Sequence, residues 1–238
     1  MRIAFDLDGV LADLETVLGE AAEHMYGRHG DRPSTAPAAA TPLEEADDQD
    51  AAPEDEPVPP LFHQLGSPEQ RRLWRRVLET ENFWETLNEI EPGIITRLAV
   101  LALERRWEVI FVTQRPSSAG DTCQLQSQRW LATHGFTMPS VFVLRGSRGK
   151  LAAALDLDVV VDDRPENCLD VVLESKAKAI LVWRGDPAAP APANAPRLKI
   201  DVVQSVAECL DKLADEREER ATGFIGRLKR FIAGSPSE

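Results

Sequence analysis

Short apolar runs alternate with helical patterns along most of this chain, and that alternation narrows the folds open to it. Each run has the length and composition of a buried strand, and the segments between most of them repeat apolar residues at helical spacing. The runs are Arg2–Phe5, Glu108–Val112, Val141–Leu144, Val159–Val161 and Ala179–Trp183. Helices are predicted over 93–104, around 125–131, and in a late segment whose apolar face comprises Val203, Val206, Leu210 and Leu213. This order predicts an α/β fold with a doubly wound parallel sheet.

A long insertion follows the first strand. Residues 14–91 are far more than a crossover connection needs. Their middle, 31–60, combines nine acidic side chains with seven prolines and seven alanines, and it has almost nothing to bury. We therefore expect a small helical cap over 14–91 that contains a disordered acidic loop at 31–60. The core is expected over 1–13 and 92–216, and a separate tail over 217–238.

Charge and cysteine content exclude several classes of protein. The formal net charge of -13 argues against a non-specific nucleic-acid binder, because phosphate backbones are held by clustered Lys and Arg. Three widely spaced cysteines, Cys123, Cys168 and Cys209, fit neither a disulfide framework nor a Cys-type zinc site, so a cytoplasmic location is expected. No apolar run approaches the length of a membrane span. In the tail, 223–232 sets apolar residues at helical spacing opposite three basic ones, which fits either a weak membrane-surface or partner helix, or a helix docked on the acidic domain.

Carboxylates occupy the end of the first predicted strand. There, Asp6 and Asp8 are separated by one residue, and Gly9 lets the chain turn sharply. Ligands of open α/β sheets bind in the crevice at the carboxyl ends of the strands, which is where these two carboxylates would project. A strand end that uses Asp only to form a turn would give the same local pattern.

Three later segments favour a functional interpretation of that pair. Thr113 ends the second strand, and Asp162 and Asp163 end another. Lys150 begins a predicted helix after a glycine-containing turn. Parallel strands end at a common edge of the sheet, so these side chains are expected to converge with the first pair. Adjacent buried carboxylates repel one another unless a cation joins them, and an all-oxygen cluster prefers Mg²⁺. The sequence thus predicts a Mg²⁺ site.

In this order, the motifs resemble those of the haloacid dehalogenase superfamily of phosphatases: Asp6-Leu7-Asp8-Gly9, Thr113, Lys150 and Asp162-Asp163. The resemblance covers roughly residues 1–13 and 93–185. It implies that Asp6 attacks phosphorus, and that Asp8 protonates the leaving oxygen and later activates water. It also implies that Thr113 and Lys150 bind the phosphoryl oxygens. Mg²⁺ would be held by Asp6, the carbonyl of Asp8 and the Asp162-Asp163 pair, with Asp163 expected as the direct ligand.

Within the superfamily, three segments resemble the 5′-deoxyribonucleotidase branch: DLDGVLAD at 6–13, NFWETL at 82–87 and EPG at 91–93. This resemblance implies a 5′-nucleotidase in which Phe83 and Trp84 stack on the base of a nucleoside monophosphate. Packing of the cap onto the core is an equal alternative for both aromatics. The sequence departs from the branch where Gln114-Arg115-Pro116 follows the threonine, in place of Ser-Pro.

Three arginines beside the motifs are further candidate site residues, and two other functions are possible alternatives to that of a small-molecule phosphatase. Arg115, Arg145 and Arg148 lie beside the motifs. One or more of them, Arg115 first, is a candidate to bind a substrate anion, and solvated loop arginines are the commoner alternative. Thr-x-Arg at 113–115 and Asp-Asp-Arg at 162–164 also resemble nucleic-acid end-processing phosphatases, although a basic surface is missing. A non-catalytic phosphate-binding regulatory module is the other alternative. The expected function is Mg²⁺-dependent hydrolysis of a small phosphorylated metabolite through an aspartyl phosphate.

Overall fold

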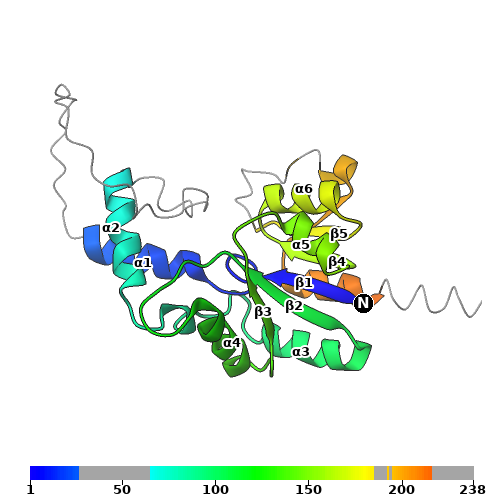
Figure 1. The fold of residues 1–238 in the computed structure, drawn as a ribbon, viewed down its shortest axis with the longest axis horizontal. Coiled ribbons are helices and arrows are strands. Elements are labelled where there is room, and N and C mark those ends of the chain that lie inside the picture. The colour runs from blue at the N-terminus through cyan, green and yellow to red at the C-terminus, as the bar shows by residue number, and fades with distance from the viewer. Residues whose placement is uncertain (27–64, 185–191, 193–194, 216–238) are drawn as a thin grey trace, which may run out of the picture.

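The structure, a computed structural model, describes residues 1–26, 65–184, 192 and 195–215. Within these ranges, six parallel strands form one sheet in the order β3-β2-β1-β4-β5-β6 (Figure 1). The strands are β1 (Arg2–Asp6), β2 (Glu108–Thr113), β3 (Ser140–Val143), β4 (Val159–Asp162), β5 (Lys178–Val182) and β6 (Ile200–Val203). This is the doubly wound parallel sheet that the sequence predicts. It places β1 between β2 and β4, the two strands whose ends carry the other motif residues.

Helices cover both faces of the sheet. They are α1 (Leu14–Tyr26), α2 (Ser67–Leu78), α3 (Ile94–Arg105), α4 (Cys123–Thr133), α5 (Arg148–Ala154) and α6 (Pro165–Glu174), with 3₁₀ turns η2 (Phe83–Glu85) and η3 (Ala195–Leu198). Successive strand residues point to opposite faces. Ile3 and Phe5 of β1 therefore join one core cluster with α3, α4 and the helix at 206–215, whereas Ala4 joins a second with α5 and α6. In Figure 1, α3 and α4 lie on the lower side of the sheet, and α5 and α6 lie on the upper side.

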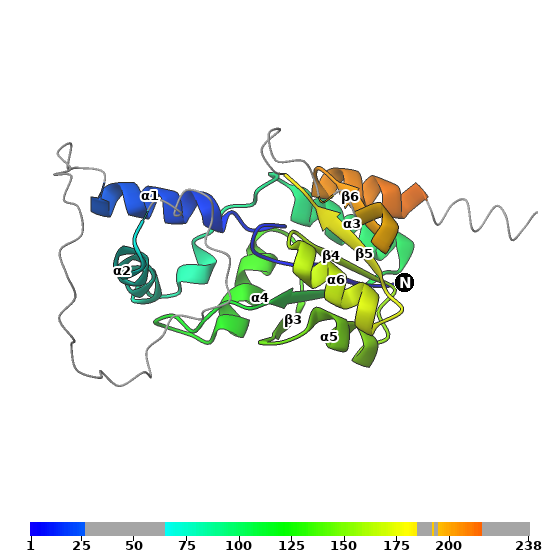
Figure 2. The same ribbon diagram turned by 90° about the horizontal axis from the view of Figure 1, so that it is seen from above.

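Two helices of the insertion pack together beyond the carboxyl end of β1. Figures 1 and 2 show α1 and α2 side by side, away from the sheet. Their contact buries Leu18, Leu73 and Val77, and the Tyr26 hydroxyl donates a hydrogen bond of 3.1 Å to the carbonyl of Glu69. The acidic loop predicted at 31–60 and the tail predicted at 217–238 lie outside the described residues.

The structure differs from expectation near the end of the core. Val203 was expected on the face of a late helix, but it ends β6, and the helix starts at 206. Strand β6 itself was not predicted. It is a four-residue edge strand in which Ile200 and Val203 are buried and the two residues between them are partly exposed, so its apolar pattern resembles a helix end as much as a strand.

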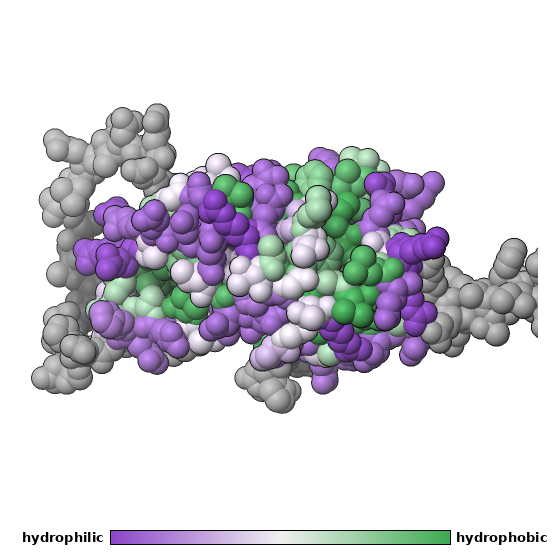
Figure 3. Space-filling view, turned by 90° about the horizontal axis from the view of Figure 1, so that it is seen from below, coloured by the Kyte–Doolittle hydropathy of each residue, from purple (hydrophilic) through white to green (hydrophobic). Residues whose placement is uncertain are grey.

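Buried thiols and exposed apolar side chains are further features of the described residues. All three cysteines are buried thiols. None of the helices in the described ranges has the length and apolar character needed to span a bilayer. Hydrophobic patches interrupt the hydrophilic surface in Figure 3. Leu103 and Met138, which are 82% and 95% exposed, precede β2 and β3, so they lie toward the amino-terminal edge of the sheet.

Candidate active site

Asp6 is the last residue of β1 and lies at the carboxyl edge of the sheet, where it is 8% exposed. Arg148, the first residue of α5, donates from Nη2 to Asp6 Oδ1 at 2.5 Å and from Nε to Asp162 Oδ2 at 3.5 Å. The guanidinium is 3% exposed, and its Nη1 has no hydrogen-bond partner among the described residues. Arg148 thus joins two buried carboxylates and leaves one buried donor without an acceptor.

Burial and mutual repulsion act together on the acidic cluster. Burial raises the pKa of the Asp6 carboxyl well above its usual value; Arg148 opposes the shift, and Asp162, Asp163 and Asp8 add to it. Burial likewise raises the pKa of Asp162. The pKa of Asp163 rises to about 7, through burial and then the neighbouring Asp162 charge. Three buried carboxyl groups that repel one another outnumber the two guanidinium groups near them, those of Arg148 and Arg164, and this favours a bound cation.

The last two carboxylates differ in how well they are paired. Asp162 is fully buried and accepts hydrogen bonds from Asn167 Nδ2 at 3.0 Å to each oxygen and from the Arg164 N–H at 2.9 Å. The carboxylate of Asp163 lies against Gly9, and it interacts electrostatically with Asp162, Asp8 and Arg164. A Cβ at Gly9, whose φ is +77°, would stand 2.0 Å from Asp163 Oδ2. Glycine at position 9 therefore lets the carboxylate of Asp163 approach the turn after β1.

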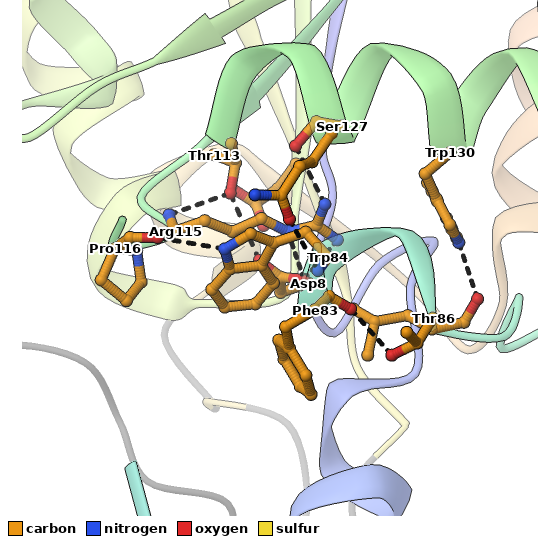
Figure 4. A network of polar contacts seen from close by, with 12 residues as sticks. Asp8, Phe83, Trp84, Thr86, Thr113, Arg115, Pro116, Ser127 and Trp130 are labelled. Carbon is orange, nitrogen blue, oxygen red and sulfur yellow. Dashed lines mark hydrogen bonds and ion pairs between the residues drawn. The ribbon is translucent and has the colours of Figure 1, made fainter. Parts of the chain in front are cut away.

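Asp8 has a different environment from Asp6. Arg115 Nε donates to both Asp8 oxygens at 2.9 Å, and Arg115 Nη2 donates to Oδ1 at 2.7 Å (Figure 4). The Thr113 hydroxyl donates to Asp8 Oδ2 at 3.2 Å. The structure thus brings Thr113, predicted as a phosphate ligand, to the same edge as Asp6 and Asp8, in contact with Asp8.

Lys150 is not brought to this cluster. Its side chain is 79% exposed and its Nζ lies 3.9 Å from Glu174 Oε1. The cause is the start of α5: Ser147 is the N-cap, its Oγ accepts from the Lys150 N–H at 3.2 Å, and Arg148 is the first helical residue. Two residues further on, a helix has turned by about 200°, so Lys150 faces away. Arg148 occupies the place expected for Lys150. The signal that could have found it is Ser147, a favoured N-cap residue.

Close packing between two helices holds Arg148 in place. A Cβ at Gly149 would stand 2.1 Å from the carbonyl oxygen of Asp170 in α6. Only glycine permits that approach, and α6 also supplies Asn167, which orients Asp162. The α5–α6 contact therefore sets both the basic residue and one carboxylate. Arg145 is exposed.

The residues expected to contact substrate are buried instead. Trp84 is fully buried, with its Nε1 donating to the Pro116 carbonyl at 3.0 Å and its backbone N–H to Gln126 Oε1 at 3.1 Å. Phe83 is 4% exposed and packs edge-on against Trp84. No ring face of Trp84 is open to a base, so packing of the insertion onto the core is the role of this pair. Arg115, also expected to reach substrate, is 1% exposed and is engaged with Asp8.

The donor set at this edge suits a hard divalent cation. In the described part of the chain, no three His, Cys, Asp or Glu side chains are arranged to hold a metal. Mg²⁺, however, is commonly bound through one or two carboxylates together with water and substrate oxygens. Asp6, Asp163 and the main-chain carbonyl of Asp8 are the oxygens available for such a site, and the uncompensated charge of the cluster fits it.

Comparisons with known proteins bear on the fold. No protein-family model and no curated protein sequence matches this chain. A protein from Thermotoga maritima, provisionally named a β-phosphoglucomutase, is 20% identical, with a TM-score of 0.53 over 90% of this chain and 98% of that one. A protein from Burkholderia xenovorans, provisionally assigned as a haloacid dehalogenase-like hydrolase, is 16% identical, with a TM-score of 0.50 over 90% and 96%. The chain therefore has the α/β fold of these proteins, as the sequence predicts.

Proposed function

We propose that this chain is a Mg²⁺-dependent phosphomonoester hydrolase of the haloacid dehalogenase superfamily, with Asp6 as nucleophile. The observation that carries the proposal is the unpartnered, buried Nη1 of Arg148, on a guanidinium that already contacts Asp6. Buried donors are nearly always satisfied, so this one points to an acceptor that arrives with the substrate. A phosphoryl oxygen is such an acceptor, and guanidinium groups bind phosphate well.

Asp6 and Arg148 would have different roles in the first chemical step. Asp6 Oδ forms a bond to phosphorus as the bond from phosphorus to the leaving oxygen breaks, giving an aspartyl phosphate. A carboxylate approaching a phosphate meets like-charge repulsion of about 4 kcal/mol at ~4 Å and an effective dielectric of about 20. The Arg148 cation offsets that repulsion for both the nucleophile and the phosphoryl group.

Asp8 would move the proton in both half-reactions. It gives a proton to the leaving oxygen in the first and takes one from the attacking water in the second, so the proton taken in one turnover serves the next. Its place two residues after Asp6, with Thr113 in contact, supports this role. A dehalogenation reaction would need no acid at this position.

Mg²⁺ would be held by Asp6, Asp163 and the carbonyl of Asp8, and it would neutralise charge that develops on the phosphoryl oxygens. Asp163 is favoured over Asp162 as the direct ligand, because Asp162 already accepts from Asn167, from the Arg164 N–H and from Arg148. Asp162 would orient Arg148 and the turn that carries Asp163.

The proposed substrate is a small phosphorylated metabolite, with nucleoside monophosphates the first class to test. That choice rests on the resemblance of DLDGVLAD, NFWETL and EPG to 5′-deoxyribonucleotidases. Base stacking on Phe83 or Trp84 is not part of the proposal, since both rings are buried.

Replacement of the nucleophile tests the proposal. Purified protein with Mg²⁺ is assayed against nucleoside monophosphates, sugar phosphates and 3′-phosphorylated oligonucleotides, alongside Asp6→Asn. Turnover is expected to fall by roughly three orders of magnitude or more in the variant and on chelation of Mg²⁺. Asp201→Asn is the matched control, because Asp201 lies on β6, outside the cluster, where it pairs with Lys178 of β5 and with Lys212 of the helix at 206–215. Asp6→Asn that keeps most of its activity would refute the mechanism.

A further inference from the structure

Arg115 is built into the fold more firmly than a substrate-binding arginine needs to be. Its side chain is completely buried, and its guanidinium lies 4.9 Å from the ring centre of Trp84 and 5.6 Å from that of Trp130. Its Nη1 donates to Ser127 Oγ at 3.0 Å. Figure 4 shows the guanidinium beside Trp84, with Ser127 on one side and Asp8 on the other. Burying a cation this deeply is costly unless it is fully paired.

The groups around Arg115 are themselves fixed. Trp84 is anchored to the Pro116 carbonyl and to Gln126 in α4, and Trp130 Nε1 donates to the Leu87 carbonyl at 2.7 Å. The two tryptophans come from η2 and from α4, so the guanidinium is enclosed where the insertion meets the core. Two elements distant in sequence, η2 and α4, therefore hold one cation against Asp8.

The contact with Asp8 uses the geometry in which arginine is strongest. Nε and Nη2 form a fork on the carboxylate, and Thr113 adds a third donor to Oδ2. Such a fork fixes both the rotamer and the plane of a carboxylate. Arg115 has its side chain sealed from solvent, so its action on a substrate would have to pass through Asp8.

We propose that Arg115 is a positioning residue that fixes Asp8 for proton transfer, and that Trp84 and Trp130 serve to hold Arg115. This inference rests on the proposed function. With its plane and rotamer fixed by Arg115, the Asp8 carboxyl group is oriented to take the proton of the attacking water, and one of its oxygens then carries that proton to the next leaving group. Loss of the fork would leave Asp8 present but unaligned.

A leaving-group comparison separates this role from a general structural one. An alkyl phosphate needs its leaving oxygen protonated, whereas 4-nitrophenyl phosphate departs as a stable anion. General acid catalysis contributes about 10²–10⁴-fold. We therefore expect Arg115→Met to lower kcat/KM on the alkyl phosphate by about 100-fold or more, and on 4-nitrophenyl phosphate by less than about tenfold. Arg115→Lys, which keeps the charge but not the fork, should show the same bias with a smaller loss.

A double-variant cycle tests whether Arg115 acts through Asp8. Asp8→Asn with Arg115→Met should be no slower on the alkyl phosphate than Asp8→Asn alone, because the second change removes nothing that remains. Arg129→Met is the control: Arg129 lies on α4 and pairs with Glu85 of η2 and Asp121, without contacting Asp8. It should leave the ratio of the two substrates unchanged.

The possible results decide between the proposals. A wild-type protein that hydrolyses neither phosphate refutes the proposed function whatever Arg115 does. An active wild type whose Arg115 variants lose both activities by the same factor, or whose double variant loses the product of the single losses, overturns the positioning role alone. If Arg115→Met melts below the assay temperature, Arg115→Lys decides by the same ratio.

Discussion

The basic residue at the acidic cluster is Arg148, and not Lys150, and this difference can be tested directly. Arg148→Met and Lys150→Met each remove one cation from the same short helix, α5. Arg148 is 3% exposed and contacts Asp6 at 2.5 Å, whereas the side chain of Lys150 is 79% exposed. Under the proposed function, only the first of these cations acts on the phosphoryl group.

The magnitude follows from distance and dielectric. A unit charge about 4 Å from a phosphoryl oxygen contributes about 4 kcal/mol at an effective dielectric of about 20. At 1.36 kcal/mol per factor of ten, that is about a thousandfold in kcat/KM. The exposed pair of Lys150 with Glu174 contributes about 0–1 kcal/mol to folding and nothing to the reaction. Lys150→Met should therefore stay within about twofold of wild type.

Steady-state hydrolysis of 4-nitrophenyl phosphate at saturating Mg²⁺ measures both variants, and thermal melts confirm that each is folded at the assay temperature. Arg148→Lys keeps the charge and loses the paired donors, so it should fall between wild type and Arg148→Met. The reasoning is wrong if Lys150→Met loses as much activity as Arg148→Met, or if Arg148→Met is unimpaired.

Two further predictions concern the junction of the insertion and the core, and a helix cap. Trp84→Leu should cost about 3 kcal/mol in urea unfolding, and lower activity on a nucleoside monophosphate and a simple alkyl phosphate alike; a higher KM for the nucleotide alone, with stability unchanged, would instead support base stacking. Glu91 accepts from the N–H groups of Val206 and Ala207 and pairs with Arg184; burial opposes ionisation, but these hydrogen bonds lower its pKa overall. Its contribution is thus present above the usual carboxyl pKa and lost as pH falls through the lowered value, so Glu91→Gln should cost about 1 kcal/mol near pH 7 and less at a pH low enough to protonate Glu91 in the folded protein. Equal costs at both pH values would contradict this.

The sheet and most motif positions could be predicted because they depend on local patterns. Buried parallel strands read as short apolar runs, and the polar residue that ends each run marks the carboxyl edge. The identity of the basic residue could not be predicted in the same way. Arg148 and Lys150 are both next to a glycine in a short helix, and a shift of two residues in the helix start decides which faces the cluster.

Local sequence patterns could not predict the burial of Trp84 and Arg115, and the reason differs from that for Arg148. Trp84 and Arg115 are types found both at ligand sites and in interiors, and what separates the two is the partner. Here the partners are Pro116, Gln126 and Asp8, the last more than a hundred residues from Arg115. Asp8 was assigned a role in chemistry, but nothing near it in sequence indicates that a second arginine holds it.

Two carboxylates on one turn can perform different chemistry only if their surroundings differ, and the two arginines supply that difference. Asp6 shares Arg148 with Asp162 and lies among other carboxylates, so a negative charge on it is poorly compensated, which would suit the proposed nucleophile. Asp8 has the fork of Arg115 to itself, and Thr113 as well. A nucleophile must reach phosphorus, which fixes its position at the strand end; a proton carrier must keep its orientation through two opposite transfers. The enclosure of Arg115 between two tryptophans matches the second demand, and the open donor of Arg148 matches the first.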